Sequence, residues 1–172
     1  MNYFELYGLK EQFLLDDQQV KKIYLTLSKK YHPDFYSGAD AAKQAEILEL
    51  STLNNKAFQV LGNFDKRMKY ILQLHQYLEE EEKYTLPQMF LMEMMDLNEL
   101  AMEVQFDPDP DKLEELLKHI EAAEGNLLQS ILPVLDRYDA ASATPEDFHQ
   151  IKEFYYKHRY LLRLREQLDK LN

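Results

Sequence analysis

The sequence predicts an all-helical protein built from two modules. Only four Gly and six Pro interrupt 172 residues, and the stretches between them are rich in Leu, Glu, Lys and Gln, which favour helices. Apolar residues recur at helical spacing along most of the chain. The formal charge is +1 over residues 1–77 (ten Lys and Arg, nine Asp and Glu) and −12 over residues 78–172 (ten and twenty-two), which sums to −11. We therefore expect an N-terminal module at 1–77, an acidic linker at 78–85 and a C-terminal module at 86–172.

The N-terminal module is expected to be a helical hairpin with short flanking helices. Its four predicted helices cover residues 2–9, 17–30, 40–61 and 65–77. The second helix carries one apolar stripe, formed by Val20, Tyr24, Leu27 and Tyr31. Gly62 and Asn63 suit the C-terminal cap of the third helix. Asn54 falls on the apolar side of that helix, where its amide needs a hydrogen-bond partner.

The turn of the hairpin is the stretch Tyr31-His32-Pro33-Asp34. Pro33 has no N–H and disfavours helical backbone at His32, so the second helix must end here. His32 and Asp34 are then expected on an exposed tip. On the helix before the tip, the residues opposite the apolar stripe are Lys22, Leu25, Thr26 and Lys29. This face is either a solvated surface or a docking face for an acidic partner.

The C-terminal module is expected to be an up-down-up bundle of three helices with short links. The first helix begins at Leu86-Pro87, and the sequence Asp-Pro-Asp-Pro ends it after Phe106. The second covers residues 111–138, and Pro133 should kink or split it near Gln129. The third begins at Thr144-Pro145 and continues to the end of the chain.

The first bundle helix has two apolar faces. One is a core stripe, formed by Phe90, Met94, Leu97, Ala101 and Val104. Leu91, Met92 and Met95 fall well away from that stripe, beside two carboxylates, Asp96 and Glu99. Met suits an adaptable contact surface, and an exposed apolar patch often marks an interface. Either this second face binds a partner, or all of these residues are core and the helix is buried between the N-terminal module and the rest of the bundle.

These features occur in the order found in a known family. Residues 3–9 (YFELYGL), the lysine-bearing helix, the His-Pro-Asp turn and residues 53–58 (LNNKAF) together resemble the J-domain of the DnaJ co-chaperones. When the first bundle helix (the Met-rich helix) is included, the whole chain resembles HscB, the co-chaperone family of iron–sulfur cluster assembly. The resemblance implies docking to an HscA- or DnaK-type ATPase chaperone and stimulation of its ATP hydrolysis. The residues implied in this docking are His32, Pro33, Asp34, Lys21, Lys22, Lys29 and Lys30.

The same resemblance implies a client for the bundle. In that family the Met-rich helix binds IscU, the scaffold on which the cluster is built, and delivers it to the chaperone. The residues implied are Leu91, Met92, Met95, Asp96, Glu99 and, from the last helix, Tyr156, where the family usually has Phe. Such chains usually have Pro before the fourth helix, and this one has Phe64. We expect a different helix start there, with no functional consequence.

Several function classes are not expected. The five His include no pair at i, i+4 and there is no Cys, so we expect no metal site, no cofactor and no cluster held by thiolates. No glycine-rich phosphate loop or nucleophile motif points to an enzyme. The acidic second half repels nucleic acid, and no apolar run reaches the ~20 residues that span a bilayer. The J-like pattern begins at Tyr3, which leaves no room for a leader, so we expect a cytoplasmic protein. The remaining alternatives are a J-domain protein with another client and a helical scaffold without chaperone coupling.

Overall fold

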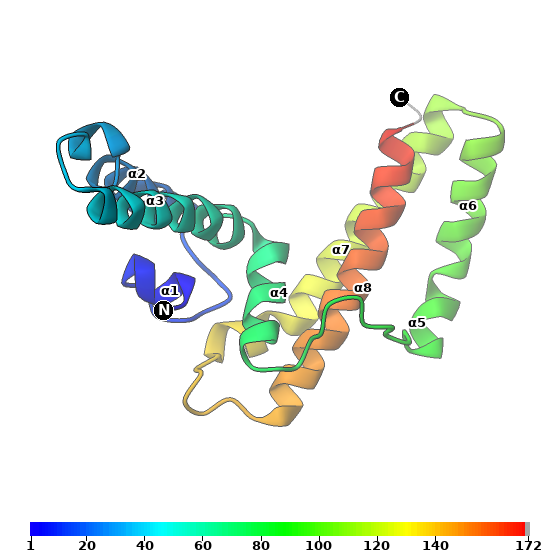
Figure 1. The fold of residues 1–172 in the computed structure, drawn as a ribbon. Coiled ribbons are helices and arrows are strands. Elements are labelled where there is room, and N and C mark those ends of the chain that lie inside the picture. The colour runs from blue at the N-terminus through cyan, green and yellow to red at the C-terminus, as the bar shows by residue number, and fades with distance from the viewer. Residues whose placement is uncertain (171–172) are drawn as a thin grey trace. The chain divides into compact units, whose positions relative to one another are not determined.

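The computed structural model describes residues 1–170, and every regular element among them is a helix (Figure 1). The chain divides into two compact units. Unit 1 contains Met1–His75 together with Tyr138–Ser142, and unit 2 contains Gln76–Arg137 and the chain from Ala143 onward. No helix in the described residues is long and apolar enough to cross a membrane.

Unit 1 is built on a helical hairpin. Its elements are α1 (Tyr3–Tyr7), α2 (Asp17–Lys30), the 3-10 turn η1 (Pro33–Tyr36), α3 (Ala41–Leu61) and α4 (Phe64–Leu74). The predicted bounds of α2 are confirmed, and α3 begins one residue after the predicted start because Asp40 caps it: its carboxylate accepts a hydrogen bond from Lys43 N at 2.7 Å. Helix α4 begins at Phe64, one residue before the predicted start, because Asn63 caps it. Phe64 therefore occupies the first position of the helix.

A buried amide joins three helices of unit 1. Asn54 of α3 is 1% exposed, and its Nδ2 donates to the Tyr24 carbonyl and to Ser28 Oγ of α2, both at 3.1 Å. Its Oδ1 accepts a hydrogen bond from the Tyr7 hydroxyl of α1 at 2.9 Å. The Asn54 amide, for which the sequence required one hydrogen-bond partner, therefore has partners on both α1 and α2. Because buried polar groups are costly when unpaired, this network fixes how α1 and α2 pack on α3.

The buried guanidinium of Arg67 joins α4 to two other parts of the chain in unit 1. Arg67 of α4 is 4% exposed, and it donates to the carbonyls of Phe13 and Leu61. The Leu61 carbonyl belongs to the last turn of α3, where backbone acceptors lack partners within the helix. Burial lowers the pKa of Arg67 below its ordinary value. The side chain thus satisfies main-chain acceptors that no other part of the helix could reach.

The turn between α7 and α8 also belongs to unit 1. The Tyr138 hydroxyl donates to Glu11 Oε1 at 2.6 Å, and the Tyr138 ring meets Phe13 edge-on at 4.7 Å between centroids. Lys10 Nζ lies 2.7 Å from Asp139 Oδ2, and this hydrogen bond lowers the pKa of Asp139. Unit 1 is therefore formed by two separate stretches of the sequence.

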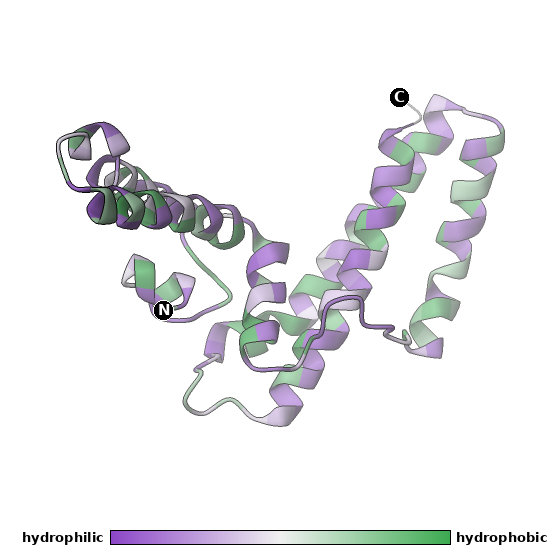
Figure 2. Cartoon of the chain, in the orientation of Figure 1, coloured by the Kyte–Doolittle hydropathy of each residue, from purple (hydrophilic) through white to green (hydrophobic). Residues whose placement is uncertain are grey.

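Unit 2 is the helical bundle. Its helices are α5 (Gln88–Glu93), α6 (Met95–Phe106), α7 (Pro110–Arg137) and α8 (Pro145–Asp169). Figure 1 shows α7 and α8 side by side along most of their length, with α6 beside them, and Figure 2 shows that each of these helices carries hydrophobic residues. The core is formed by Phe90, Met94, Leu97, Ala101, Val104, Leu116, Ile120, Leu161, Leu164 and Leu168. The predicted core stripe of the Met-rich helix is thus confirmed.

Two predicted features of the bundle helices are corrected. The single helix expected from Leu86 to Phe106 is broken at Met94, whose backbone (φ −83°, ψ −7°) separates α5 from α6. Of the kink or split predicted from Pro133, the split is wrong, since α7 is one helix from Pro110 to Arg137 with Pro133 inside it. Packing along both sides of a long helix can hold it together across one missing N–H, whereas no sequence signal marks Met94.

Candidate functional sites

The His-Pro-Asp turn is exposed at the end of the α2–α3 hairpin. The side chains of His32 and Asp34 are 52% and 89% exposed, and Pro33 is exposed as well. His32 Nδ1 accepts a hydrogen bond from the Asp34 N–H at 3.3 Å and lies 3.7 Å from Asp34 Oδ2. The tip, as we call these three residues, is therefore ordered by its own short-range contacts and offers both functional side chains to solvent.

Hydrogen bonds from both flanking helices hold the tip. The Tyr36 hydroxyl donates to the Lys30 carbonyl at 2.9 Å, which ties η1 to the end of α2. From α3, Gln44 Nε2 donates to the carbonyls of Ser37 and Ala39 at 3.1 and 3.0 Å. None of these partners is one of the tip's own side chains. These bonds remain when the tip is altered, and a change at His32 removes only the acceptor of the Asp34 N–H.

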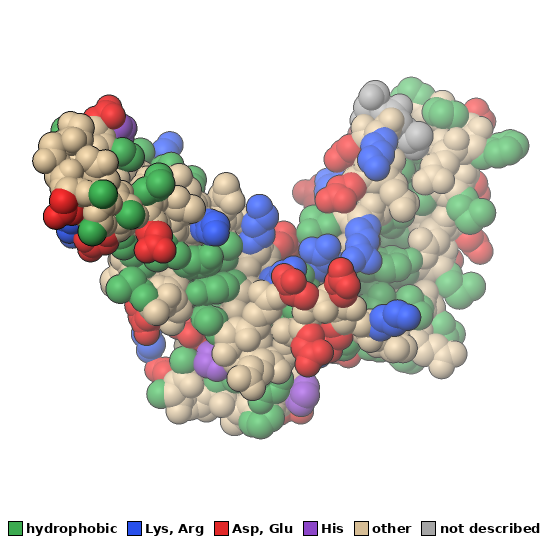
Figure 3. All heavy atoms as spheres, in the orientation of Figure 1, with side chains coloured by type: hydrophobic (Ala, Val, Ile, Leu, Met, Phe, Trp, Pro, Cys, Tyr) green, Lys and Arg blue, Asp and Glu red, His purple; other side chains and the backbone are tan. Residues whose placement is uncertain are grey.

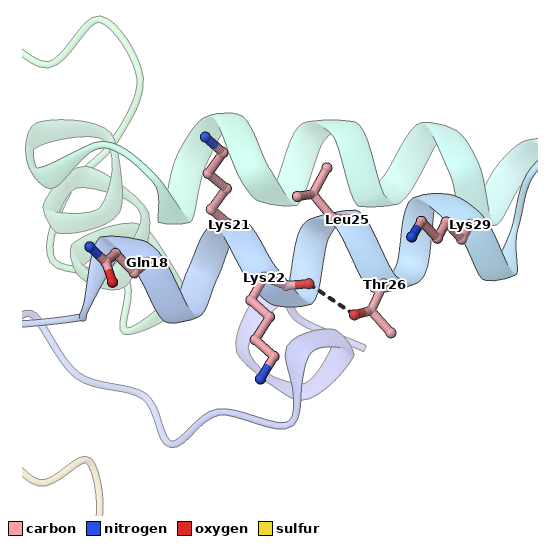
Figure 4. Close-up of a pocket in the computed structure, with 6 residues that line it drawn as sticks. All are labelled: Gln18, Lys21, Lys22, Leu25, Thr26 and Lys29. Carbon is pink, nitrogen blue, oxygen red and sulfur yellow. Dashed lines mark hydrogen bonds between the residues drawn. The ribbon is translucent and has the colours of Figure 1, made fainter.

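A basic face leads along α2 to the tip. Lys21, Lys22, Lys29 and Lys30 are all exposed. Lys21, Lys22 and Lys29 line a shallow groove with Gln18, Leu25 and Thr26, and Figure 4 shows Lys21 and Lys22 extending away from α2 in opposite directions. Leu25 is 49% exposed, so the groove has an apolar floor between positive charges. The four lysines and the tip together are termed the docking face.

The second predicted surface, on the Met-rich segment of unit 2, is also exposed to solvent. Leu91 is 41% exposed, Met92 60% and Met95 55%, and the carboxylates Asp96 and Glu99 are exposed beside them. Phe90, Met94 and Leu97, in the same stretch, are 3%, 6% and 8% exposed. Within unit 2, Leu91, Met92 and Met95 are therefore not part of the bundle core. These five exposed residues are termed the Met face.

Tyr156 of α8, the client residue implied from the last helix, is half-buried and contacts other residues of unit 2. Its ring stacks on Tyr84 at 4.2 Å between centroids with only 5° between the planes, and its hydroxyl donates to Glu82 at 2.9 Å. Lys152 also donates to Glu82, at 2.6 Å. Burial raises the pKa of Tyr156, and Glu82 adds to the effect. The segment interpreted as a solvated acidic linker is thus packed onto α8 at Glu82 and Tyr84, since long-range contacts override its polar composition.

Sequence reasoning missed three exposed apolar side chains near these surfaces. Phe35 is 75% exposed, next to the tip, with its ring 5.9 Å from that of His32. Met102 and Phe106 of α6 are 69% and 95% exposed. Met102 and Phe106 fall on the same side of the helix as Met95 at about 100° per residue, so the helical period is a signal that could have found them. In the described residues 1–170, no group of three His, Asp or Glu is arranged to hold a metal ion.

Known proteins share both parts of this architecture. Residues 2–70 match the family model of the DnaJ domain, and residues 86–169 match the model described as the HSCB C-terminal oligomerisation domain. The structure of chaperone HscB from Vibrio cholerae is similar with a TM-score of 0.77 and 25% identity, over 99% of this chain and 97% of that one. The crystal structure of the human co-chaperone protein HscB is similar with a TM-score of 0.81 and 25% identity, over 98% of this chain and 81% of that one.

The fold and the exposed His-Pro-Asp tip define a J-domain co-chaperone. The bundle that follows the J-domain, and the likeness over nearly the full length of two HscB structures, narrow the class further. The chain belongs to the HscB family, whose role is in iron–sulfur cluster assembly.

Proposed function

We propose that this protein binds an IscU-type scaffold through its bundle and delivers it to an HscA- or DnaK-type ATPase chaperone, whose ATP hydrolysis it stimulates. It catalyses no reaction itself and acts in the cytoplasm, within iron–sulfur cluster assembly or transfer. The observation that carries the proposal is the presence of two separate exposed surfaces in one HscB-family chain. One is the polar docking face of unit 1, and the other is the apolar and acidic Met face of unit 2.

The docking face supplies charge and a rigid tip. Exposed lysines steer an acidic partner over distances of about a Debye length, roughly 8 Å at physiological salt. Asp34, at 89% exposure, offers its carboxylate to a basic group of the ATPase, while Pro33 fixes the backbone between it and His32. The protein adds no catalytic group to the ATPase and acts by favouring its hydrolysis-competent state.

The ATPase role is tested with variants of the tip. His32→Gln and Asp34→Asn should abolish stimulation in single-turnover ATP hydrolysis, because they alter the two exposed side chains that the tip offers to the ATPase, while the bonds from Tyr36 and Gln44 remain. Circular dichroism should show an unchanged fold. Asp136→Asn, an exposed carboxylate of α7, is the matched control and should stimulate normally. Undiminished stimulation by both tip variants would refute the role of the docking face.

The lysines are tested separately through association kinetics. Lys22→Glu/Lys29→Glu should slow association with the ATPase and flatten its dependence on salt, because exposed charges act mainly on the on-rate. Lys112→Glu/Lys118→Glu, on the bundle helix α7 with side chains 42% and 73% exposed, changes the net charge by the same amount and is the control. An on-rate that is independent of salt and unchanged in the double variant would contradict electrostatic docking.

The client role is tested by comparing the two faces of the Met-rich segment. Leu97→Ala removes a core side chain that is 8% exposed and should cost ~2–5 kcal/mol of stability. Met92→Ala/Met95→Ala should leave the melting temperature nearly unchanged but remove much of the IscU affinity in a calorimetric titration, since a few apolar anchors carry most interfaces. Stimulation of the ATPase without IscU should persist. If stimulation persists and IscU does not bind the wild-type protein, the chain is a J-domain co-chaperone for another client.

A further inference from the structure

Three side chains form a straight apolar stripe along the whole of α6. At about 100° per residue, Met102 and Phe106 lie within about 20° of Met95 on the helix circumference. All three are exposed, at 55%, 69% and 95% for Met95, Met102 and Phe106. The core residue Val104 lies about 180° away and is 1% exposed. At about 1.5 Å per residue, the stripe is roughly 16 Å long.

This stripe has no packing role in unit 2. The core of the bundle is complete on the opposite side of α6, and Phe106 at 95% exposure contacts solvent on almost its entire surface. Three large apolar side chains in one line on one exposed helix face form a contiguous patch, and such patches mark interaction sites. Scattered exposed apolar residues would need no such explanation.

The charges around the stripe identify the kind of partner. Between residues 88 and 111 every ionisable side chain is acidic, and the sequence contains no Lys, Arg or His there. Asp96 and Glu99 lie along one edge of the stripe. Glu103 lies on the same edge one turn further, and its carboxylate is 4.0 Å from Lys112 Nζ of α7, so Asp96 and Glu99 carry most of the negative charge of this edge. Figure 3 shows hydrophobic and acidic side chains together along the free side of α6. A second copy of this face would place carboxylates against carboxylates, and nucleic acid would be repelled.

We infer that the client surface extends from the Met face to Phe106, and that the IscU-type scaffold meets it with an apolar strip about 16 Å long bordered on one side by Lys and Arg. The inference rests on the proposed function and specifies how far along the helix the client reaches. Met102 and Phe106 act as apolar anchors at the far end, and the acidic edge selects the orientation of the basic border.

The test is a calorimetric titration of the full chain with an IscU-type scaffold protein, with rates measured by surface plasmon resonance. Met102→Ala/Phe106→Ala should weaken binding by about tenfold or more, mainly through faster dissociation, because buried anchors govern the off-rate. Leu128→Ala/Leu132→Ala is the matched control, since these α7 side chains are 39% and 40% exposed, and its affinity should be unchanged. Added salt should slow association of the wild type and of Met102→Ala/Phe106→Ala alike.

Each other result has a defined meaning. If Met92→Ala/Met95→Ala weakens binding and Met102→Ala/Phe106→Ala does not, the surface ends before Met102 and only this inference fails. If the wild-type protein does not bind the scaffold, the proposed function fails first. If sedimentation shows a wild-type dimer that Met102→Ala/Phe106→Ala dissociates, the stripe pairs two copies of this chain and the inference is overturned.

Discussion

The buried network around Asn54 allows a quantitative test of how unit 1 holds its docking face. Tyr7→Phe removes the hydroxyl that lies 2.9 Å from Asn54 Oδ1, and this leaves a buried acceptor without that donor. The expected cost is ~1–3 kcal/mol. Asn54→Ala should cost a similar ~1–3 kcal/mol. It removes the donor to Tyr24, but that carbonyl still accepts from Ser28 Oγ at 2.8 Å.

The double variant separates the hydrogen bond from its surroundings. If Tyr7 and Asn54 are coupled, Tyr7→Phe/Asn54→Ala should cost less than the sum of the single variants, by ~0.5–3 kcal/mol. Each kcal/mol corresponds to roughly 4–8 °C in the melting temperature of a unit of this size. Burial raises the pKa of the Tyr7 hydroxyl above its ordinary 10.0. Its stabilising contribution is therefore fully present below pH 10.0 and is lost as the pH rises beyond the raised value.

The measurement is urea unfolding at 25 °C, with hydrogen exchange of the α2 and α3 amides to follow unit 1 alone. Stimulation of the partner ATPase well below the midpoint should persist in all three variants, because the bonds that hold the tip do not involve Asn54. Single and double variants that add to within ~0.5 kcal/mol would show that the two side chains are not coupled, and would refute the reasoning.

Three further predictions test other parts of the fold. Arg67→Met should destabilise unit 1 by ~2–5 kcal/mol in the same urea assay, because two buried carbonyls lose their donor, whereas a loss under 1 kcal/mol would exclude this role. The hydrogen bond from Lys152 holds the pKa of Glu82 below its ordinary 4.5. The contact between Glu82 and Tyr156 should therefore be present above pH 4.5 and lost as the pH falls through the lowered pKa. NMR would report the loss as greater exposure of the Tyr156 ring, and a contact that survives at pH 2 would contradict the prediction. Gly8→Ala should cost ~1–2 kcal/mol in thermal melts, since Gly8 has φ +63°, and an unchanged melt would show that the turn readjusts.

Local signals in the sequence determined most of the helices and the tip. Pro33 ends α2 through its missing N–H, and Asp16 and Asp40 cap α2 and α3 with their own carboxylates. These effects act within four residues, so the sequence contains all of the information. The hydrophobic period likewise separated the core stripe at Phe90 and Leu97 from the exposed Met face.

Only the tertiary structure decided the contacts between distant segments. The break at Met94, the packing of Glu82 and Tyr84 onto α8, and the place of Tyr138 in unit 1 have no local sequence signal. The pairs Glu82–Tyr156 and Glu11–Tyr138 are 74 and 127 residues apart in the chain. Residue type and helical period describe only neighbours within a few turns, and which distant side chain satisfies a buried polar group depends on how the helices pack.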